Sequence, residues 1–471
     1  MIMKKLSALI LSLIFVVGLL LSACENQEVS TQDQANISQS KPSPDGDKLT
    51  FYCVGEYGDE LYEFIKYYNK YCAVNDNFED SVEFVYFEST PELNAVLSTE
   101  LMAGGGPDIL SITQGFPFEK LVNNSFLADV DRILEENNSS LDFSDYNKAV
   151  MDSGVFKGKR LIVPLYYRAD ILFTTKERLA LSRAEDNSSF ESVLKGFQIQ
   201  NPDMYFINPY SVDSFYFSFI RQFIDFENGT TDFESEEFFS LAEAFKEALL
   251  KGKSYKSLED SEFQYSENHS KYLFSANELC FYGGSLTDVA RTYMNALGDE
   301  CTLTVCPDFN RKGEVSANVE VGFSINANCK KRDKAAKFIE YLLSEKSQGY
   351  FGGGRDDTWS TGLALPVKNS VFENSVNEAL KYSWHFSDEL AKTDEYVIET
   401  VKLKNKFLTE EYLPLLKNIS SVNLYGYFSQ TESYLYKNVI GDILEDYLSD
   451  KITTQKLVFR LTSAINIYMN E

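Results

Sequence analysis

The chain is poor in histidine, in paired cysteines and in positive charge. Among its 471 residues there are two histidines, His269 and His385, and no Cys-x-x-Cys pair. Because histidine and paired cysteine are the usual zinc ligands, a metal site has little support, and we expect neither a metal nor a cofactor. Basic residues number 44 against 71 acidic ones, which gives a formal net charge of −27. Nucleic acids and anionic membranes require basic patches, so the charge argues against both as partners.

Two common catalytic signatures are also missing. Neither Gly-x-Ser-x-Gly nor His-Glu-x-x-His occurs in the sequence, which removes the simplest indications of a serine hydrolase or a zinc protease. A glycosidase, however, needs only two carboxylates at a suitable separation, and carboxylates are abundant here. A secreted hydrolase that acts on carbohydrate therefore stays open as an alternative function.

The first two dozen residues have the pattern of a secretory signal peptide. Lys4 and Lys5 precede an apolar run from Leu6 to Leu20, and Leu-Ser-Ala then leads to Cys24. The run is shorter than the ~20 residues of a membrane-spanning helix. The cysteine after Leu-Ser-Ala resembles the bacterial lipoprotein signal, in which this residue is acylated with palmitate and becomes the mature N-terminus. We expect residues 1–23 to be removed, and the protein to be lipid-anchored through Cys24 on the extracellular face of the cell membrane.

A polar linker follows the anchor. Residues 24–47 are rich in Gln, Asn, Ser and Asp and contain no aromatic residue, a composition that predicts a disordered tether. Export permits disulfides among the remaining six cysteines. Three of them, Cys53, Cys280 and Cys306, stand in apolar, strand-like runs, where cysteine often packs as a small apolar residue. We therefore favour buried thiols, and a disulfide framework stays open.

The folded part begins with an alternation of strands and helices. Apolar runs predict strands at 49–54, 82–87 and 108–112. Helical spacing predicts one helix whose apolar face begins at Leu61 and a second from Pro91 to Met102, ended by three glycines. This order indicates an α/β fold with a parallel sheet. Ligands of such sheets collect beyond the carboxyl ends of the strands, which makes the loops after the first and third strands candidate sites, and we expect Asp108 to brace its turn.

Further elements are predicted toward the C-terminus. Strand-like runs occur at 303–306 and 321–325, and helical spacing occurs at 238–250. We expect Asp333 to be the N-cap of a helix that buries Ala335, Ala336, Ile339, Leu342 and Leu343. The last third is predicted to be helical, with packing stripes at 440–447 and 457–468.

Four segments, in this order, resemble the family 1 extracellular solute-binding proteins of ABC importers, the group that contains maltose-binding protein. The segments are Glu100–Leu110, Phe156–Tyr166, Leu273–Gly284, and Val321–Ile325 joined to Lys334–Leu342 with Gly362–Val367 downstream. None is specific alone, but their order and spacing cover residues 48 to 471.

The resemblance implies a type II periplasmic-binding-protein-like fold with two discontinuous α/β lobes, a hinge and C-terminal helices. One lobe would comprise 48–165 plus 303–366, and the other 166–302 plus 367–471. The chain would cross first near Pro164 to Arg168, return near Cys306 and cross again after Pro366.

The implied function is binding, not catalysis. A protein of this family would hold a small ligand, most of all a mono- or oligosaccharide, and deliver it as a monomer to ABC transporter permease subunits. The alternative to import is a sensory or peptide-binding lipoprotein of the same fold.

The resemblance also implies a set of ligand-binding residues from both lobes. Arg168 stands where maltose-binding protein has a carboxylate, so either an acidic sugar or a structural carboxylate such as Asp170 is a possible partner. The set is Glu56, Tyr57, Thr113, Gln114, Tyr166, Tyr167, Arg168, Tyr210, Asp213, Tyr216, Tyr282, Gly283, Gly284, Tyr425 and Tyr427.

Overall fold

A computed structural model describes most of the compact unit Gly46–Glu471. The described residues are 46–55, 60–112, 118–169, 171–175, 220–225, 228–251, 282–284, 303–306, 315–352, 365–374, 417–424 and 439–470, with 410, 414 and 435. The predicted signal peptide, linker and Cys24 lie outside them. Over these ranges, none of the helices combines the length and the apolar character needed to cross a bilayer.

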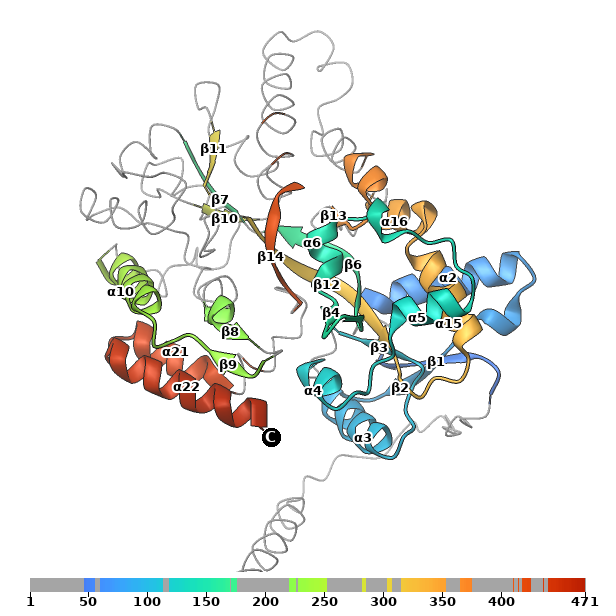
Figure 1. Ribbon diagram of the computed structural model, residues 1–471, viewed down its shortest axis with the longest axis horizontal. Helices are drawn as coiled ribbons and strands as arrows, with labels where there is room; N and C mark the ends of the chain where they lie inside the picture. The colour runs from blue at the N-terminus through green and yellow to red at the C-terminus, as the bar shows by residue number, and fades with distance from the viewer. Residues whose placement is uncertain are drawn as a thin grey trace, which may run out of the picture. The chain divides into compact units, whose positions relative to one another are not determined.

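The main sheet has seven strands in the order β13-β6-β12-β3-β1-β2, with β14 paired to β12 (Figure 1). Strand β1 pairs in parallel with β2 and with β3, which confirms the predicted parallel sheet. Strand β12 is antiparallel to both β3 and β6, so the complete sheet is mixed. The strands are β1 Leu49–Val54, β2 Val82–Phe87, β3 Ile109–Ser111, β6 Val163–Ala169, β12 Val315–Ile325, β13 Leu365–Pro366 and β14 Ile419–Asn423.

Helices cover this sheet because their apolar residues recur at helical spacing. Helix α2 (Glu60–Val74) buries Leu61, Phe64, Ile65 and Tyr68 as predicted. Tyr68 meets Phe338 of α15 (Arg332–Leu342) edge to face, with ring centroids 5.1 Å apart. Each such side chain contributes about 1.5–3 kcal/mol when it is fully buried, so this aromatic layer is a major part of the core.

Other short helices complete the layer around the sheet. Helix α3 agrees with the predicted one and begins after Ser89, whose side chain accepts a hydrogen bond from the Glu92 amide over 3.4 Å. The remaining helices of this part are α3 Thr90–Met102, α4 Phe118–Asn123, α5 Val130–Glu136, α6 Lys148–Asp152 and α16 Glu345–Gly352, with 3-10 turns η1 Phe78–Asp80 and η2 Phe143–Asp145.

A second sheet of three strands is joined to the first by two strand crossings. Its order is β10-β7-β11, with both pairs antiparallel; the strands are β7 Ile171–Thr175, β10 Tyr282–Gly284 and β11 Leu303–Cys306. Only Asp170 separates β6 of the large sheet from β7 of the small one. The chain returns between β11 and β12, and these two strands pair with β7 and β6 respectively.

The strand pairing shows which sheet the residues near the expected crossings join. Residues 303–306 pair with β7 in the small sheet, whereas we expected them to open the second part of the first lobe. Residues 166–169 continue β6 in the large sheet, and β14 joins that sheet through β12. Residues 166–169 stay in the large sheet because β6 and β12 remain paired up to Ala169 and Ala317.

The C-terminal helices pack as their stripes predict. Helix α10 (Glu236–Lys251) contacts α21 (Gly441–Leu448) and α22 (Thr454–Asn470). The α22 stripe from Leu457 to Tyr468 is buried, as are Ile440 and Tyr447 beside it. Short antiparallel pieces complete the described part: β4 Val155–Phe156 with β5 Lys159–Arg160, and β8 Ile224–Asp225 with β9 Thr230–Thr231, next to the 3-10 turn η5 Ile220–Phe223.

The cysteines and the start of α15 test two smaller expectations. Cys53, Cys72 and Cys329 are buried thiols outside any disulfide, as favoured for Cys53, and Cys280 lies outside the described residues. The helix α15 buries the expected face, but its N-cap is Lys331 and Asp333 lies in the first turn. The expectation that Asp333 is the cap was wrong because the N-cap lies two residues earlier, at Lys331.

Candidate functional site

The carboxyl ends of three strands meet at one edge of the large sheet. Strands β1 and β3 are parallel, and β6 runs the same way because β12 is antiparallel to both β3 and β6. The segments that follow Val54, Ser111 and Ala169 therefore all leave the sheet at this edge. The predicted residues Glu56, Tyr57, Thr113 and Gln114 follow the first two of these strands and lie outside the described residues.

A network around Asp108 fixes the start of β3. One oxygen of its carboxylate, Oδ2, accepts hydrogen bonds from the Thr50 amide (3.0 Å), the Thr50 hydroxyl (3.1 Å) and the Lys331 ammonium (2.9 Å). The Asn326 amide donates to the carbonyls of Gly105 and Pro107 over 2.9 Å each. This confirms that Asp108 braces the turn, and the brace holds the strands that lead to the candidate edge.

The two tyrosines predicted at the crossing have different surroundings. Tyr166 is 2% exposed, its ring lies 5.4 Å from that of Phe64, and its hydroxyl donates to the Gln348 carbonyl. Its side chain is part of the core in this structure. Tyr167 is 1% exposed but lines a cavity on the side where α6 lies.

For four other predicted residues the structure describes the backbone. Arg168 pairs with Asn318 of β12. Tyr282, Gly283 and Gly284 form β10 opposite Phe173, Leu172 and Ile171 of β7. The remaining predicted contacts lie outside the described residues: Tyr210, Asp213, Tyr216, Tyr425 and Tyr427.

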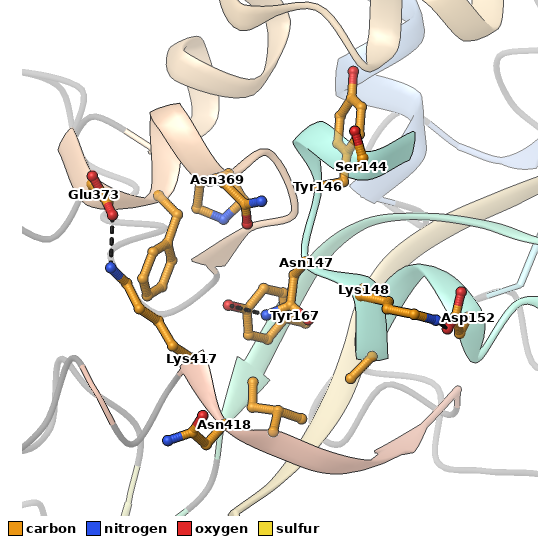
Figure 2. A pocket seen from close by; sticks show the side chains of 14 residues that line it. Ser144, Tyr146, Asn147, Lys148, Asp152, Tyr167, Asn369, Glu373, Lys417 and Asn418 are labelled. Atoms are coloured by element: carbon orange, nitrogen blue, oxygen red, sulfur yellow. Dashed lines mark hydrogen bonds and ion pairs between the residues drawn. The ribbon is translucent and has the colours of Figure 1, made fainter. Parts of the chain in front are cut away.

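The cavity beside Tyr167, here called the α6 cavity, has a volume of about 1120 Å³ (Figure 2). Four separate segments form its wall, and each is attached to the large sheet. The lining residues are Ser144, Tyr146, Asn147, Lys148, Ala149, Asp152, Tyr167, Pro366, Asn369, Phe372, Glu373, Lys417, Asn418 and Ile419. Ligand pockets for small molecules typically measure ≈ 300–1,000 Å³, so the cavity is large enough for a sugar-sized molecule.

Buried hydrogen bonds hold the walls of the α6 cavity in place. Gln348, which is fully buried, accepts from the amides of Val367 (3.1 Å) and Lys368 (3.4 Å) and donates to the Leu342 carbonyl (3.1 Å). On the opposite wall, Arg160 donates to the Met151 carbonyl at the end of α6 over 2.6 Å. These contacts make the cavity a fixed part of the sheet and its helices.

The charges in the α6 cavity are paired with one another. Lys417 and Glu373 form an ion pair of 2.7 Å, and Lys148 pairs with Asp152 within α6. Figure 2 shows the two pairs on opposite sides of Tyr167, which lies between them. The four charges sum to zero, so the lining as a whole is polar and neutral.

The Tyr167 hydroxyl is a buried hydrogen-bond donor. It accepts a long hydrogen bond of 3.5 Å from the Asn147 amide, and within the described residues its own proton has no acceptor. Burial raises the pKa of Tyr167, although the Asn147 hydrogen bond acts in the opposite direction. The phenol therefore stays protonated at physiological pH and keeps a proton that it can donate.

Most of the α6 cavity was missed from the sequence. Its amide residues, Asn147, Asn369 and Asn418, come from segments that are far apart along the chain. Asn147 is the N-cap of α6, where its side chain accepts from the Val150 amide over 3.2 Å. A residue with such a local structural role gives no separate sign that it lines a cavity.

Comparisons with known proteins place these features in a family. The family model described as "Bacterial extracellular solute-binding protein" matches residues 66–367, more than half of the chain. Among solved structures, the chain is similar to the sugar-binding protein MalE of Xanthomonas citri, with 16% identity and a TM-score of 0.57 over 90% of this chain and 97% of that one. No curated protein matches the sequence.

Two further solved structures are similar. A family 1 extracellular solute-binding protein of Bifidobacterium longum subsp. infantis has 14% identity and a TM-score of 0.53, over 88% of this chain and 98% of that one. The GacH receptor of Streptomyces glaucescens, also solved in complex with acarbose, has 15% identity and a TM-score of 0.50, over 90% and 98%. At such low identity the likeness concerns the fold, which is the two-lobe α/β fold of type II.

Proposed function

The chain belongs to the bacterial extracellular solute-binding proteins, and from this premise we propose that it delivers a captured solute, chemically unchanged, to the permease of an ABC importer. The family match over residues 66–367 is the observation that carries the proposal. It covers the strands β3 and β6, whose carboxyl ends meet at the candidate edge, and it includes the return through β12.

We propose a mono- or oligosaccharide as the solute. The similar structure from Xanthomonas citri is named a sugar-binding protein, and that from Streptomyces glaucescens binds acarbose. The chain also has 29 tyrosines, and tyrosine suits a sugar because its ring packs on the ligand while its hydroxyl bonds polar groups. The contacts would come from the residues predicted after β1 and β3 and from Tyr167 and Arg168 at the crossing, together with those from the second lobe.

The proposed mechanism is capture by closure. Two strand crossings connect the large and small sheets, and Asp170 alone separates β6 from β7. A ligand that contacts residues on both sides of these crossings stabilises the form in which the two sides approach. The lobes would then divide near Asp170 and between Cys306 and Val315, with the protein anchored to the membrane through an acylated Cys24.

A thermal-shift screen tests the solute class. The purified protein is heated with neutral sugars, uronic acids, amino acids and short peptides. A ligand present at 100 times its Kd raises the free energy of unfolding by about 2.7 kcal/mol, so we expect a clear shift with at least one neutral saccharide. A shift confined to amino acids or peptides would overturn the sugar proposal.

Matched variants test the proposed site. Glu56→Ala and Gln114→Ala should remove the shift, because each loses side-chain hydrogen-bonding groups for sugar hydroxyls. Glu63→Ala is the control, since it removes an exposed carboxylate on α2 that pairs with Lys66. An equal loss in all three variants, or none in the first two, would contradict the placement of the site.

A further inference from the structure

Apart from Tyr167, the α6 cavity and the proposed solute site are formed by different residues. Of the fourteen residues that line the cavity, Tyr167 alone belongs to the predicted ligand contacts. The cavity is built on α6, on the end of β6, on the segment after β13 and on the start of β14. It can therefore be occupied or blocked without changing the loops that follow β1 and β3.

The Tyr167 hydroxyl keeps a proton that a ligand in the cavity can accept. Tyr167 is 1% exposed, and its hydroxyl proton has no acceptor within the described part of the chain. A hydroxyl can donate one hydrogen bond and accept others, and the described residues supply one donor to it, the Asn147 amide. An acceptor oxygen supplied by a ligand would complete the hydrogen bonding of this phenol.

The other polar groups of the lining suit hydroxyl groups. Asn369 and Asn418 are exposed residues that line the cavity. Within the described residues, neither side chain makes a hydrogen bond. An amide offers both donors and an acceptor, which is what a molecule with many hydroxyls requires. Phe372, which is buried, adds an apolar surface to the same wall.

The charges of the lining disfavour an ionic ligand. Each ammonium in the cavity already pairs with a carboxylate, in Lys417–Glu373 and Lys148–Asp152. An anion would compete with these carboxylates and would also meet the field of a protein with a net charge of −27. A cation would find no unpaired carboxylate among the lining residues.

We propose that the α6 cavity is a second binding site, which takes a neutral, polyhydroxylated small molecule of the sugar or polyol class. The site lies beside the strands that cross between the two sheets. Tyr167 is three residues before Asp170, and Ile419 pairs with Val315 at the start of β12. The bound molecule therefore contacts the chain immediately before the first crossing and next to the return.

Amide hydrogen exchange with defined probes tests this proposal. The probes are glucose, maltose, maltotriose and inositol, with glucuronate and glucosamine as charged counterparts. We expect slower exchange in residues 144–152 and 417–423 with at least one neutral probe and with neither charged one. No protection by any neutral probe, or equal protection by the charged ones, would overturn the proposal.

Tyr167→Phe separates a ligand contact from a structural role. The variant removes a hydroxyl whose one described hydrogen bond is the long 3.5 Å bond from Asn147, so the ligand-free protein should be nearly as stable as the wild type. The affinity of the cavity for the neutral probe should fall about three- to tenfold, the factor of one neutral hydrogen bond. Tyr71→Phe, which changes a partly exposed tyrosine of α2, is the control and should leave the affinity unchanged. An unchanged affinity in Tyr167→Phe would refute the contact.

The double variant Glu56→Ala/Gln114→Ala distinguishes this site from the proposed solute site. Protection of the cavity segments should persist in it, because none of their residues is altered. Loss of that protection together with solute binding would show that there is one site, and the second site would be refuted. Ala149→Leu, which places a larger side chain in the cavity wall, should remove the protection and leave solute binding intact.

Discussion

Replacing Gly154 by alanine should destabilise the protein, because the chain leaves no room for a side chain there. An ideal Cβ on Gly154 would lie 2.1 Å from the Ile162 carbonyl oxygen and 2.9 Å from its carbon. Both atoms belong to the backbone, so they cannot rotate away as the end of a side chain would. The Gly154 carbonyl also accepts hydrogen bonds from the amides of Leu161 (2.9 Å) and Ile162 (3.1 Å).

The expected cost follows from these contacts. Relieving the overlap separates the end of α6 from the hairpin β4–β5, which weakens two hydrogen bonds worth about 1 kcal/mol each. Overpacking adds about 1–3 kcal/mol. If about half of the strength of these two bonds is lost, Gly154→Ala should lower the free energy of unfolding by about 2–4 kcal/mol, as measured by urea denaturation.

A matched glycine provides the control. A Cβ on Gly105 would have one neighbour within 4 Å, the Glu100 carbonyl oxygen at 3.5 Å, and its φ lies outside the left-handed region. Gly105→Ala should thus be neutral or slightly stabilising. If the free energy of unfolding of Gly154→Ala lies within about 0.5 kcal/mol of the wild-type value, the two segments do not approach as closely as described.

Three further predictions follow from other buried contacts. Asp108→Asn should cost about 2 kcal/mol in urea denaturation, because a charge-assisted bond to Lys331 is lost; a change below 0.5 kcal/mol would contradict the brace. Arg160→Met should cost about 2–3 kcal/mol, since it loses the bond to the Met151 carbonyl and a guanidinium lying 3.9 Å over an aromatic ring; unchanged thermal stability would refute this. Burial and the nearby carboxylate of Asp108 raise the pKa of Cys329 from 9.0 to about 12, so the stability that the thiol contributes is full below pH 9 and lost as the pH rises toward 12. Denaturation across this range should show a shallower fall for Cys329→Ala, and parallel curves would argue against the shift.

Local patterns predicted the first half of the large sheet. The runs at 49–54 and 82–87 and the stripe of α2 each carry their own periodicity, so β1, β2 and α2 followed from short windows of sequence. The role of Asp108 also followed from its place directly after the glycine-rich turn, where we expected it to brace the chain. Family resemblance supplied the rest of the fold.

Pairing between distant segments could not be predicted in the same way. Strand β14 pairs with β12 although Ile419 and Val315 are far apart in sequence, and no local pattern specifies that partner. The same holds for the small sheet, where Leu303 pairs with Thr175. The pairing of residues 303–306 with β7 could not be predicted for this reason, because a strand pattern does not say which sheet the strand joins.

The candidate site shows the same limit at the level of side chains. Tyr166 and Tyr167 are neighbours in one strand, and their sequence context does not distinguish a core residue from a cavity residue. The structure distinguishes them, because the Tyr166 hydroxyl donates a hydrogen bond to the Gln348 carbonyl, whereas the Tyr167 hydroxyl accepts one from Asn147 beside the cavity. Asn369 and Asn418 reach the same cavity from separate segments, which only tertiary structure reveals.

Isothermal titration with saccharides, followed by recovery of the ligand, tests the central claim most directly. We predict saturable binding of a saccharide, which mass spectrometry then finds at its original mass after prolonged incubation with the protein. Recovery of a cleaved or otherwise altered sugar would contradict the account. So would a heat of binding that is seen only with compounds of another class.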